Sequence, residues 1–335
     1  MQTTYDLPLQ SKRILLGLWL AASMFTAAAL AAQPPEDFPK ELVEFAPYAG
    51  NPIFGGTNRD TWDNTIRERG WIMREDGRYR MWYSGYNPNR CGNVLVGYAV
   101  SLDGLHWSRY SASPIYDKGC WTEDMQVVKQ GGTYYMFAEG THDPVPQVLA
   151  PEKGIRWRDR DNVPHLLTSK DGIHWQERGD LDVRDTNGRP IPKPYGTPAV
   201  FIKGPTWYLF YERGDGGIWL ATSTDRKVWH DVSDQPVIAL GPQPYDNHKM
   251  ALNQVIEYQG KYYGYYHAMG RVDGRNGLWT TCVAMSPDLI HWKKYPKNPI
   301  LANGRSSGIL VNDGREYRLY TMHPDVWVYF PRHLK

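Results

Sequence analysis

Short aromatic strands recur along the chain, each directly after a pair of residues that favours a tight turn. Five runs share this pattern, and they begin at Tyr79, Tyr134, Trp207, Tyr262 and Tyr317. The turn pairs include Asp76-Gly77 and Gly131-Gly132, which suit two-residue hairpin turns. An apolar stretch such as Met125–Val128 precedes each turn, so every unit is predicted to contain a β-hairpin. The runs start 55 residues apart, except for 73 residues between the second and third, and such a period indicates a repeat architecture.

A second motif follows four of the five hairpins. Its members are Ser101–Trp107, Ser169–Trp175, Ser223–Trp229 and Ser286–Trp292, and each begins with the pattern Ser-x-Asp. The Asp side chain can accept hydrogen bonds from nearby backbone amides, and the Trp ring can hold the turn against a sheet. We interpret these Ser-x-Asp turns as structural, each belonging to an outer hairpin of its unit.

A third element ends most units, and an extra copy precedes the first hairpin. The copies are Ser113–Ile115, Gln235–Ile238 and Asn298–Ile300, with Asn51–Ile53 as the extra one. The last unit ends without a copy of its own, so the N-terminal segment is expected to complete it. The sequence therefore predicts an all-β fold with few helices: a five-bladed β-propeller of four-stranded antiparallel blades, with the ring closed by the N-terminal segment.

The N-terminus has the pattern of a secretory signal. Lys12-Arg13 precede an apolar run from Ile14 to about Ala32, and Ala29-Leu30-Ala31 matches a small-x-small cleavage site. A membrane anchor is the alternative, although the run barely reaches the roughly 20 residues of a span. We predict a signal peptide at 1–31, a single catalytic domain at 32–335 and a secreted or periplasmic protein with no membrane association after cleavage.

Charge and cysteine content narrow the classes of partner. The net charge is +2, which gives no broad attraction to nucleic acid or membrane, and no nucleic-acid partner is expected. Export permits disulfides, and the spacing of Cys91, Cys120 and Cys282 does not match a zinc site. Cys91 and Cys120 could pair near one rim, while Cys282 falls in a strand and is expected to be a buried thiol. The oligomeric state is left open.

Hairpin geometry gathers polar residues at one face of the ring. Residues ten before and five after the first aromatic of each run should lie roughly opposite each other at the open end of the hairpin. The Ser-x-Asp turns should then lie on the other face. The predicted pairs are Arg69 with Ser84, Asp124 with Glu139, Thr197 with Glu212, Leu252 with His267, and Ser307 with Met322.

Carboxylates dominate the predicted rim, and their convergence suits acid–base chemistry on a sugar. One carboxyl must be protonated to release the leaving group, and another must be ionised to activate water or attack. Close neighbours can push one another's pKa values apart. The alternative for any one of them is a structural ion pair with Arg67, Arg69 or Arg213. The catalytic candidates are Asp124, Glu212, Glu68, Asp63 and Glu139.

Other residues near this rim could contact substrate. Aromatic faces stack on sugar rings, although packing between blades is the alternative for each Trp, and a hydrogen-bonded structural His is the alternative for each His. The substrate-binding candidates are Arg69, Trp62, Trp121, Glu123, His248, His267 and His323. No metal ligands or cofactor are predicted; a structural Ca²⁺ in the central channel fits the fold class, but no ligand set identifies one.

The phrases GTYYMFAEG and YRMWYSG, together with the SxDGxHW turns, resemble those of five-bladed propeller glycoside hydrolases such as families 43, 32 and 117. The resemblance covers about residues 45–331. It implies a base Asp on the innermost strand of the first blade, a second Asp on the second blade, and a general acid, usually Glu, on the third. Asp124 matches the second position, whereas Arg69 occupies the first, and Glu212 or a His such as His267 or His323 would have to serve as the acid.

The function predicted from these features is an exo-acting glycoside hydrolase that cleaves a plant, algal or microbial oligo- or polysaccharide. Long segments before the hairpins would wall a pocket, and the Pro-rich, charged segment 143–163 could be a lid. The alternatives are a non-catalytic carbohydrate-binding propeller, a sialidase-like enzyme and a phosphorylase on a related propeller. Five units rather than six, and the absence of an arginine triad, count against the sialidase.

Overall fold

The computed structural model describes residues 37–89, 94–118, 121–141 and 162–332. The predicted signal peptide, Cys91, Cys120 and nearly all of the predicted lid lie outside these ranges. The described chain contains one helix, α1 (Lys40–Val43), and otherwise strands. No helix within these ranges is long and apolar enough to cross a bilayer.

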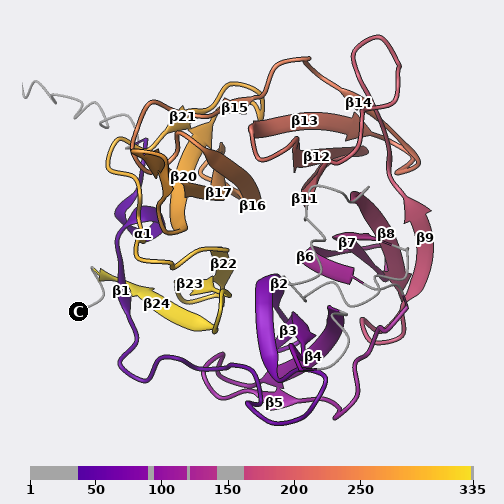
Figure 1. Cartoon of the computed structure of the whole chain (residues 1–335), viewed down its shortest axis with the longest axis vertical. Coiled ribbons are helices and arrows are strands. Elements are labelled where there is room, and N and C mark those ends of the chain that lie inside the picture. Colours follow the sequence, from indigo (N-terminus) through magenta and orange to yellow (C-terminus); the bar gives the residue numbers. More distant parts are fainter. Residues whose placement is uncertain (1–36, 90–93, 119–120, 142–161, 333–335) are drawn as a thin grey trace, which may run out of the picture. The chain divides into compact units, whose positions relative to one another are not determined.

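The first three blades are each built on four antiparallel strands that follow one another in chain order (Figure 1), and in blade 3 the added strand β10 pairs parallel with β14. Blade 1 consists of β2 (Thr65–Glu75), β3 (Arg78–Tyr86), β4 (Leu95–Ser101) and β5 (Ser108–Arg109). Blade 2 consists of β6 (Trp121–Gln130), β7 (Thr133–Thr141), β8 (Val163–Ser169) and β9 (Gln176–Asp180). Blade 3 consists of β11 (Gly196–Lys203), β12 (Thr206–Glu212), β13 (Gly217–Ser223) and β14 (Val228–Asp231), extended by β10 (Asp182–Arg184) and β15 (Ile238–Ala239).

The last two blades complete the ring, and the fifth takes a strand from the N-terminal segment. Blade 4 consists of β16 (Lys249–Tyr258), β17 (Lys261–Met269), β20 (Thr280–Ser286) and β21 (Lys293–Lys294), with a small added hairpin of β18 (Arg271–Val272) and β19 (Arg275–Asn276). Blade 5 consists of β22 (Ile309–Asn312), β23 (Tyr317–Thr321), β24 (Trp327–Pro331) and β1 (Phe45–Pro47). Because β1 pairs antiparallel with β24, the predicted closure is confirmed.

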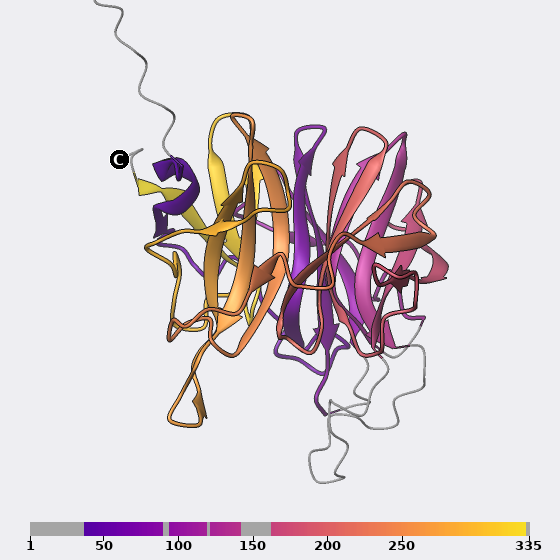
Figure 2. The ribbon, with the colours of Figure 1, turned by 90° about the horizontal axis from the view of Figure 1, so that it is seen from above.

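The connections between the strands lie on two opposite faces of the ring (Figure 2). Each aromatic run begins the second strand of a blade directly after a tight turn, and Asp76 and Gly77 adopt the positive φ values of 49° and 74° that such a turn requires. The third strand of the first four blades ends beside the start of the second, as in the pairing of Tyr79 with Ser101, so the Ser-x-Asp turns lie on the face of the hairpin turns. We call this the turn face, and the face where the inner hairpins open the open face.

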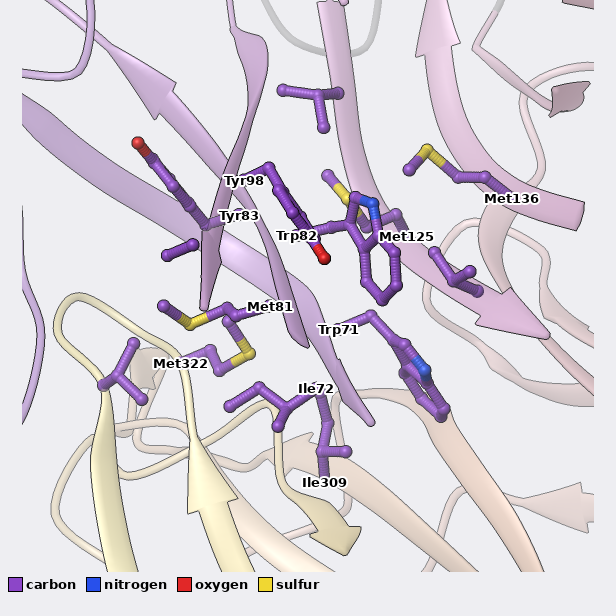
Figure 3. Packing of buried hydrophobic residues seen from close by; sticks show 14 of the residues in the cluster. Trp71, Ile72, Met81, Trp82, Tyr83, Tyr98, Met125, Met136, Ile309 and Met322 are labelled. Carbon is purple, nitrogen blue, oxygen red and sulfur yellow. The ribbon is translucent and has the colours of Figure 1, made fainter. Parts of the chain in front are cut away.

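The aromatic runs pack between the blades (Figure 3). Met81 and Trp82 of blade 1 are fully buried, and Met81 belongs to one cluster with Met125 of blade 2 and Ile309 of blade 5. The Trp82 Nε1 donates a 2.7 Å hydrogen bond to the carbonyl of Gly172, in the Ser-x-Asp turn of blade 2. Neighbouring blades are therefore joined by buried apolar surface and by polar anchors at the turn face. Cys282 is a buried free thiol on β20, as predicted.

The Ser-x-Asp turns have the structural role expected of them. In blade 2, Asp171 Oδ1 accepts hydrogen bonds from the amides of Ile173 and His174 at 2.8 and 2.9 Å, and its Oδ2 contacts the His174 ring at 2.7 Å. These donors hold the pKa of the Asp171 carboxyl below its usual range. The turns of blades 1 and 4 repeat the same contacts, whereas the turn of blade 3 has Val228 in place of the His.

Asp171→Ala is expected to lower the free energy of unfolding by about 1 kcal/mol, because two backbone amides lose their side-chain acceptor. Because the pKa of Asp171 is lowered in the folded state, this contribution is fully present at neutral pH and is lost as the pH falls through the folded pKa. Urea unfolding at pH 7 measures the difference. A loss of kcat that, expressed as a free energy, exceeds the loss in the free energy of unfolding would contradict the structural assignment of the turn face.

Candidate active site

The inner strands of four blades are interrupted at the open face by β-bulges. Register shifts fall between Arg67 and Trp71 on β2, Glu123 and Gln126 on β6, Gly196 and Ala199 on β11, and Leu252 and Gln254 on β16. The predicted pairs in these four blades are therefore wrong by one or two residues, whereas the pair of Ser307 with Met322 in blade 5 agrees with the observed register. Glu139 lies opposite Glu123, and Glu212 lies opposite Gly196. The extra bulge residues cause the difference, and Asp124 and Thr197 adopt φ values of 49° and 48° within them.

Arg69 fills the point where the inner strands converge. Its side chain is fully buried, and its guanidinium donates to the carbonyl oxygens of Asp124, Pro198, Leu252 and Asn253, which belong to three other blades. The Asn253 and Pro198 bonds measure 2.7 and 2.6 Å. Burial lowers the pKa of Arg69 to about 10, while the charges of Asp124 and Glu139 oppose that shift. Arg69 thus acts as a hub for four blades, and its geometry gives a substrate no exposed guanidinium to contact.

The same geometry bears on a calcium ion in the central channel. A calcium site needs six to eight oxygen ligands. At the convergence of the inner strands, the carbonyl oxygens already accept hydrogen bonds from Arg69, and the group that fills the space is itself a cation. The residues at this point do not fit Ca²⁺, and among the described residues no cluster of three or more His, Cys, Asp or Glu could hold a metal.

Glu212, which is buried, and Glu139, which is half-buried, lie beside this hub. Glu139 Oε2 accepts hydrogen bonds from the Thr197 amide at 2.8 Å and the Thr197 hydroxyl at 3.3 Å, and its Oε1 accepts one from Asn162 Nδ2 at 3.2 Å. Gly196 permits this approach, because a Cβ there would lie 2.2 Å from Oε2. Glu212 Oε2 accepts a hydrogen bond from the Asp215 amide. Each carboxyl is therefore held by backbone of the third blade.

Asp215 is a member of this cluster that the sequence analysis missed. It lies in the turn between β12 and β13 and has a φ of 61°. Its carboxylate forms an ion pair with Lys249 of blade 4, and both side chains are 31% exposed. The signal was present in the sequence: the run Arg213–Gly217 is a glycine-rich turn at the open end of a hairpin whose strand ends on Glu212.

Burial and neighbouring charges shift the pKa values of Glu212 and Glu139 to different extents. Burial raises the pKa of the Glu212 carboxyl well above its usual range, and the nearby charges of Glu139, Asp215 and Asp124 act in the same direction. Burial also raises the pKa of Glu139, although hydrogen bonds from Thr197 and Asn162 oppose this shift. The pKa values of both carboxyls are raised, and Glu212 has the stronger reasons to hold a proton at neutral pH because three neighbouring charges add to its burial.

Asp124 and Glu123 are placed differently on the second blade. Asp124 is 8% exposed, and its Oδ1 accepts a 3.2 Å hydrogen bond from the Arg69 amide. Glu123 pairs with Arg67, with Oε2 3.1 Å from Nε, which is the ion pair that the alternative interpretation expected. Arg213 instead pairs with Asp231, outside the cluster.

Of the two remaining carboxylate candidates, Asp63 makes its contacts outside this cluster. Asp63 accepts hydrogen bonds from the Tyr83 hydroxyl at 3.0 Å and from Arg109 Nε at 2.7 Å, so it belongs to a network with β3 and β5 of blade 1. Glu68 lies on β2 within the bulge, and its side chain is outside the described part of the structure.

His267 lies beside the hub. Its Nδ1 lies 2.7 Å from Asn253 Oδ1, and its ring contacts the ring of Trp279 edge-on at 4.9 Å. Burial lowers the pKa of His267 to about 3, assisted by the positive charge of Arg69. His267 is therefore neutral at ordinary pH and poorly suited to donate a proton. His323 and His248 lie on the open face and are partly exposed.

The two tryptophan candidates pack within the protein. Trp62 stacks on Tyr83 with ring centroids 5.8 Å apart, and its Nε1 donates to the Ala112 carbonyl at 3.0 Å. Trp121 is 1% exposed, and the Arg67 guanidinium lies 5.1 Å from its ring centroid. Trp121 has no exposed face for a sugar, whereas Trp62 keeps part of its surface accessible.

Comparisons by sequence give limited matches. No family model matches the chain. The chain is 27% identical to acid beta-fructofuranosidases of Vigna radiata var. radiata and Phaseolus vulgaris, over 27% of this chain and 18% of each enzyme. The match thus spans less than a fifth of the length of these curated relatives.

Comparisons by structure extend over nearly the whole chain. A candidate glycosidase from Bacteroides thetaiotaomicron superimposes with a TM-score of 0.70 at 16% identity, covering 89% of this chain and 99% of that one. A glycosyl hydrolase from Bacteroides ovatus gives 0.67 at 14% identity, with 86% and 94% covered. The beta-1,2-mannobiose phosphorylase of Listeria innocua gives 0.61 at 14% identity, with 85% and 95% covered. The chain therefore has the fold of the five-bladed propeller glycoside hydrolases and of related phosphorylases.

Proposed function

We propose that this protein is a glycoside hydrolase whose general acid is Glu212. The observation that carries the proposal is the carboxyl cluster beside Arg69, in which the burial of Glu212 and three neighbouring carboxylates raise the pKa of Glu212. A carboxylic acid that keeps its proton at neutral pH can protonate the glycosidic oxygen as the bond breaks. The match to beta-fructofuranosidases and the propeller fold support the same reaction class.

The ionised partner in this proposal is Asp124. Its Oδ1 accepts the Arg69 amide, and the Arg69 guanidinium lies beside it, which is an environment that favours negative charge. In the reaction, Asp124 would remove a proton from the attacking water or attack the anomeric carbon, while Glu212 gives its proton to the leaving oxygen. Glu139 and Asp215 keep Glu212 protonated between turnovers.

An exo-acting enzyme is the mode we propose. Connections at the open face would wall such a site, including the segment 240–248, which is tied by the Gly241 amide to the Asp246 carbonyl at 3.0 Å. Such walls suit a pocket that admits a chain end better than a cleft open at both ends.

Asp124→Asn is expected to lower kcat/KM for an aryl glycoside by about 10²- to 10⁴-fold, because it removes the ionised carboxylate and keeps the shape of the side chain. Steady-state hydrolysis measures the loss, and circular dichroism checks the fold. Asp273→Asn, on the exposed turn between β18 and β19, is the matched control and should retain full activity. Full activity of Asp124→Asn would remove Asp124 from the mechanism.

The same assay separates hydrolysis from phosphorolysis. Turnover of oligosaccharides should proceed without inorganic phosphate, because the half-buried basic side chains near the cluster already pair with carboxylates: Arg67 with Glu123, Arg213 with Asp231 and Lys249 with Asp215. A strict requirement for phosphate, with a sugar phosphate as product, would assign the protein to the phosphorylases instead.

A further inference from the structure

A cavity opens on the open face between blades 4 and 5. Its volume is about 450 Å³, which lies in the range of small-molecule sites. Three connections form its walls: Trp279 lies in the connection before β20, Arg305 before β22, and His323 and Asp325 after β23. The cavity is therefore on the same face of the ring as Glu212.

The charged groups of this cavity are not paired with each other. The Arg305 guanidinium lies on the face of Trp327, with Cζ 3.5 Å from the ring centroid, and the described structure gives it no carboxylate partner. Asp325 lines the same cavity and forms no ion pair within the described residues. By contrast, the half-buried Arg67, Arg213 and Lys249 of this face each form one.

This arrangement prepares Arg305 to bind a carboxylate. Stacking on Trp327 holds the guanidinium plane and leaves its edge for a bidentate contact, which is the geometry that Arg provides for carboxylates. Asp325, as an acceptor, suits the hydroxyl donors of a sugar ring. A ligand that carries both a carboxylate and several hydroxyls would satisfy both groups.

An apolar wall connects this cavity to the axis. Leu278 is 66% exposed and lines the cavity beside Trp279. The Trp279 ring contacts the ring of His267, which lies at the hub with Asn253. A sugar unit that stacks on this wall would therefore be the neighbour of the sugar unit that reaches the carboxyl cluster.

We propose that this cavity is a subsite for an acidic sugar residue, a uronate whose carboxylate is bound by Arg305. The inference deepens the proposed function and rests on it for the neighbouring reaction site. It gives the substrate class as a glycan that contains a uronate unit, with hydroxyl contacts from Asp325 and a stacking surface at Trp279.

Equilibrium binding tests the subsite independently of turnover. The probes are the methyl glycosides of glucuronic acid and galacturonic acid, each compared with its neutral methyl ester by NMR titration of the full chain. At least one acid should bind about tenfold more tightly than its ester. Arg305→Gln should remove this preference with little effect on the ester, and Arg305→Lys should restore part of it.

Arg275→Gln is the matched control, because it removes one positive charge from the exposed β18–β19 hairpin of the same face. It should leave the preference for the acid unchanged. If neither acid binds better than its ester, or if Arg305→Gln keeps the preference, the subsite is overturned, while hydrolysis of a neutral glycoside would still support the proposed function. Binding that depends on Arg305 without turnover of any glycoside would retain the subsite and overturn the proposed hydrolase.

Discussion

Glu212→Gln is expected to lower kcat for a glycoside with a poor leaving group by about 10²- to 10⁴-fold, because the departing oxygen then receives no proton. Burial and the neighbouring carboxylates raise the pKa of Glu212 and keep it protonated, and the amide of Gln fits the same space without an acidic proton. Steady-state kinetics at neutral pH measures the loss.

The choice of leaving group separates a general acid from a residue that only supports the site. A dinitrophenyl glycoside needs little protonation, so Glu212→Gln should retain far more activity on it than on an alkyl glycoside. The alkaline limb of the pH profile should also disappear in this variant, because that limb reports the loss of the acidic proton. Equal losses on both substrates would show that Glu212 does not act as the acid.

The raised pKa also has a consequence for stability. A carboxyl whose pKa is raised by folding contributes stability below its unfolded pKa and loses that contribution as the pH rises through the folded pKa. Wild-type protein should therefore lose stability between mildly acidic and alkaline pH, and Glu212→Gln should lose less over the same range.

Arg69→Met is expected to lower the free energy of unfolding by about 3–5 kcal/mol, the largest effect on stability that we predict. The guanidinium donates to carbonyl oxygens of three other blades, and its removal leaves these buried acceptors without their donor. Denaturant unfolding followed by tryptophan fluorescence measures the change.

Arg74→Met on the same strand is the matched control. Arg74 is exposed, so its replacement should change the free energy of unfolding by less than about 0.5 kcal/mol. Arg69→Lys should recover only part of the stability, because one ammonium cannot reach all four carbonyls. A midpoint for Arg69→Met equal to that of Arg74→Met would contradict the role of Arg69 as a hub.

The repeat was sufficient to predict the fold because each level of the sequence indicates the same structure. Turn pairs such as Asp76-Gly77 and aromatic runs that pack between blades recur in five units, and Ser-x-Asp turns recur in four of them. The contribution of the N-terminal segment to the last blade could be predicted because Asn51–Ile53, a copy of the element that ends most units, precedes the first hairpin. Local patterns repeated five times leave little freedom for another topology.

The site was harder to predict because it depends on departures from the repeat. A bulge adds a residue without a distinctive composition, so the pairs of Asp124 and Glu212 were displaced. Asp215 lies just beyond the strand that the hairpin rule covers. The sequence makes Arg69 a candidate for contact with substrate or for an ion pair, and only coordinates show that four carbonyl oxygens at the bulges accept hydrogen bonds from its guanidinium.

The closure of the ring joins β1 to β24, which are synthesised early and late in translation. Asn51 exchanges two side-chain hydrogen bonds with the backbone of Val328, at 2.8 and 2.9 Å, across a separation of 277 positions. Contacts of such long range carry the greatest loop-closure cost in folding, whereas the other blades form from consecutive hairpins. Completion of the fifth blade is therefore expected to be the last step of folding, and until then β24 presents an unpaired edge to other chains.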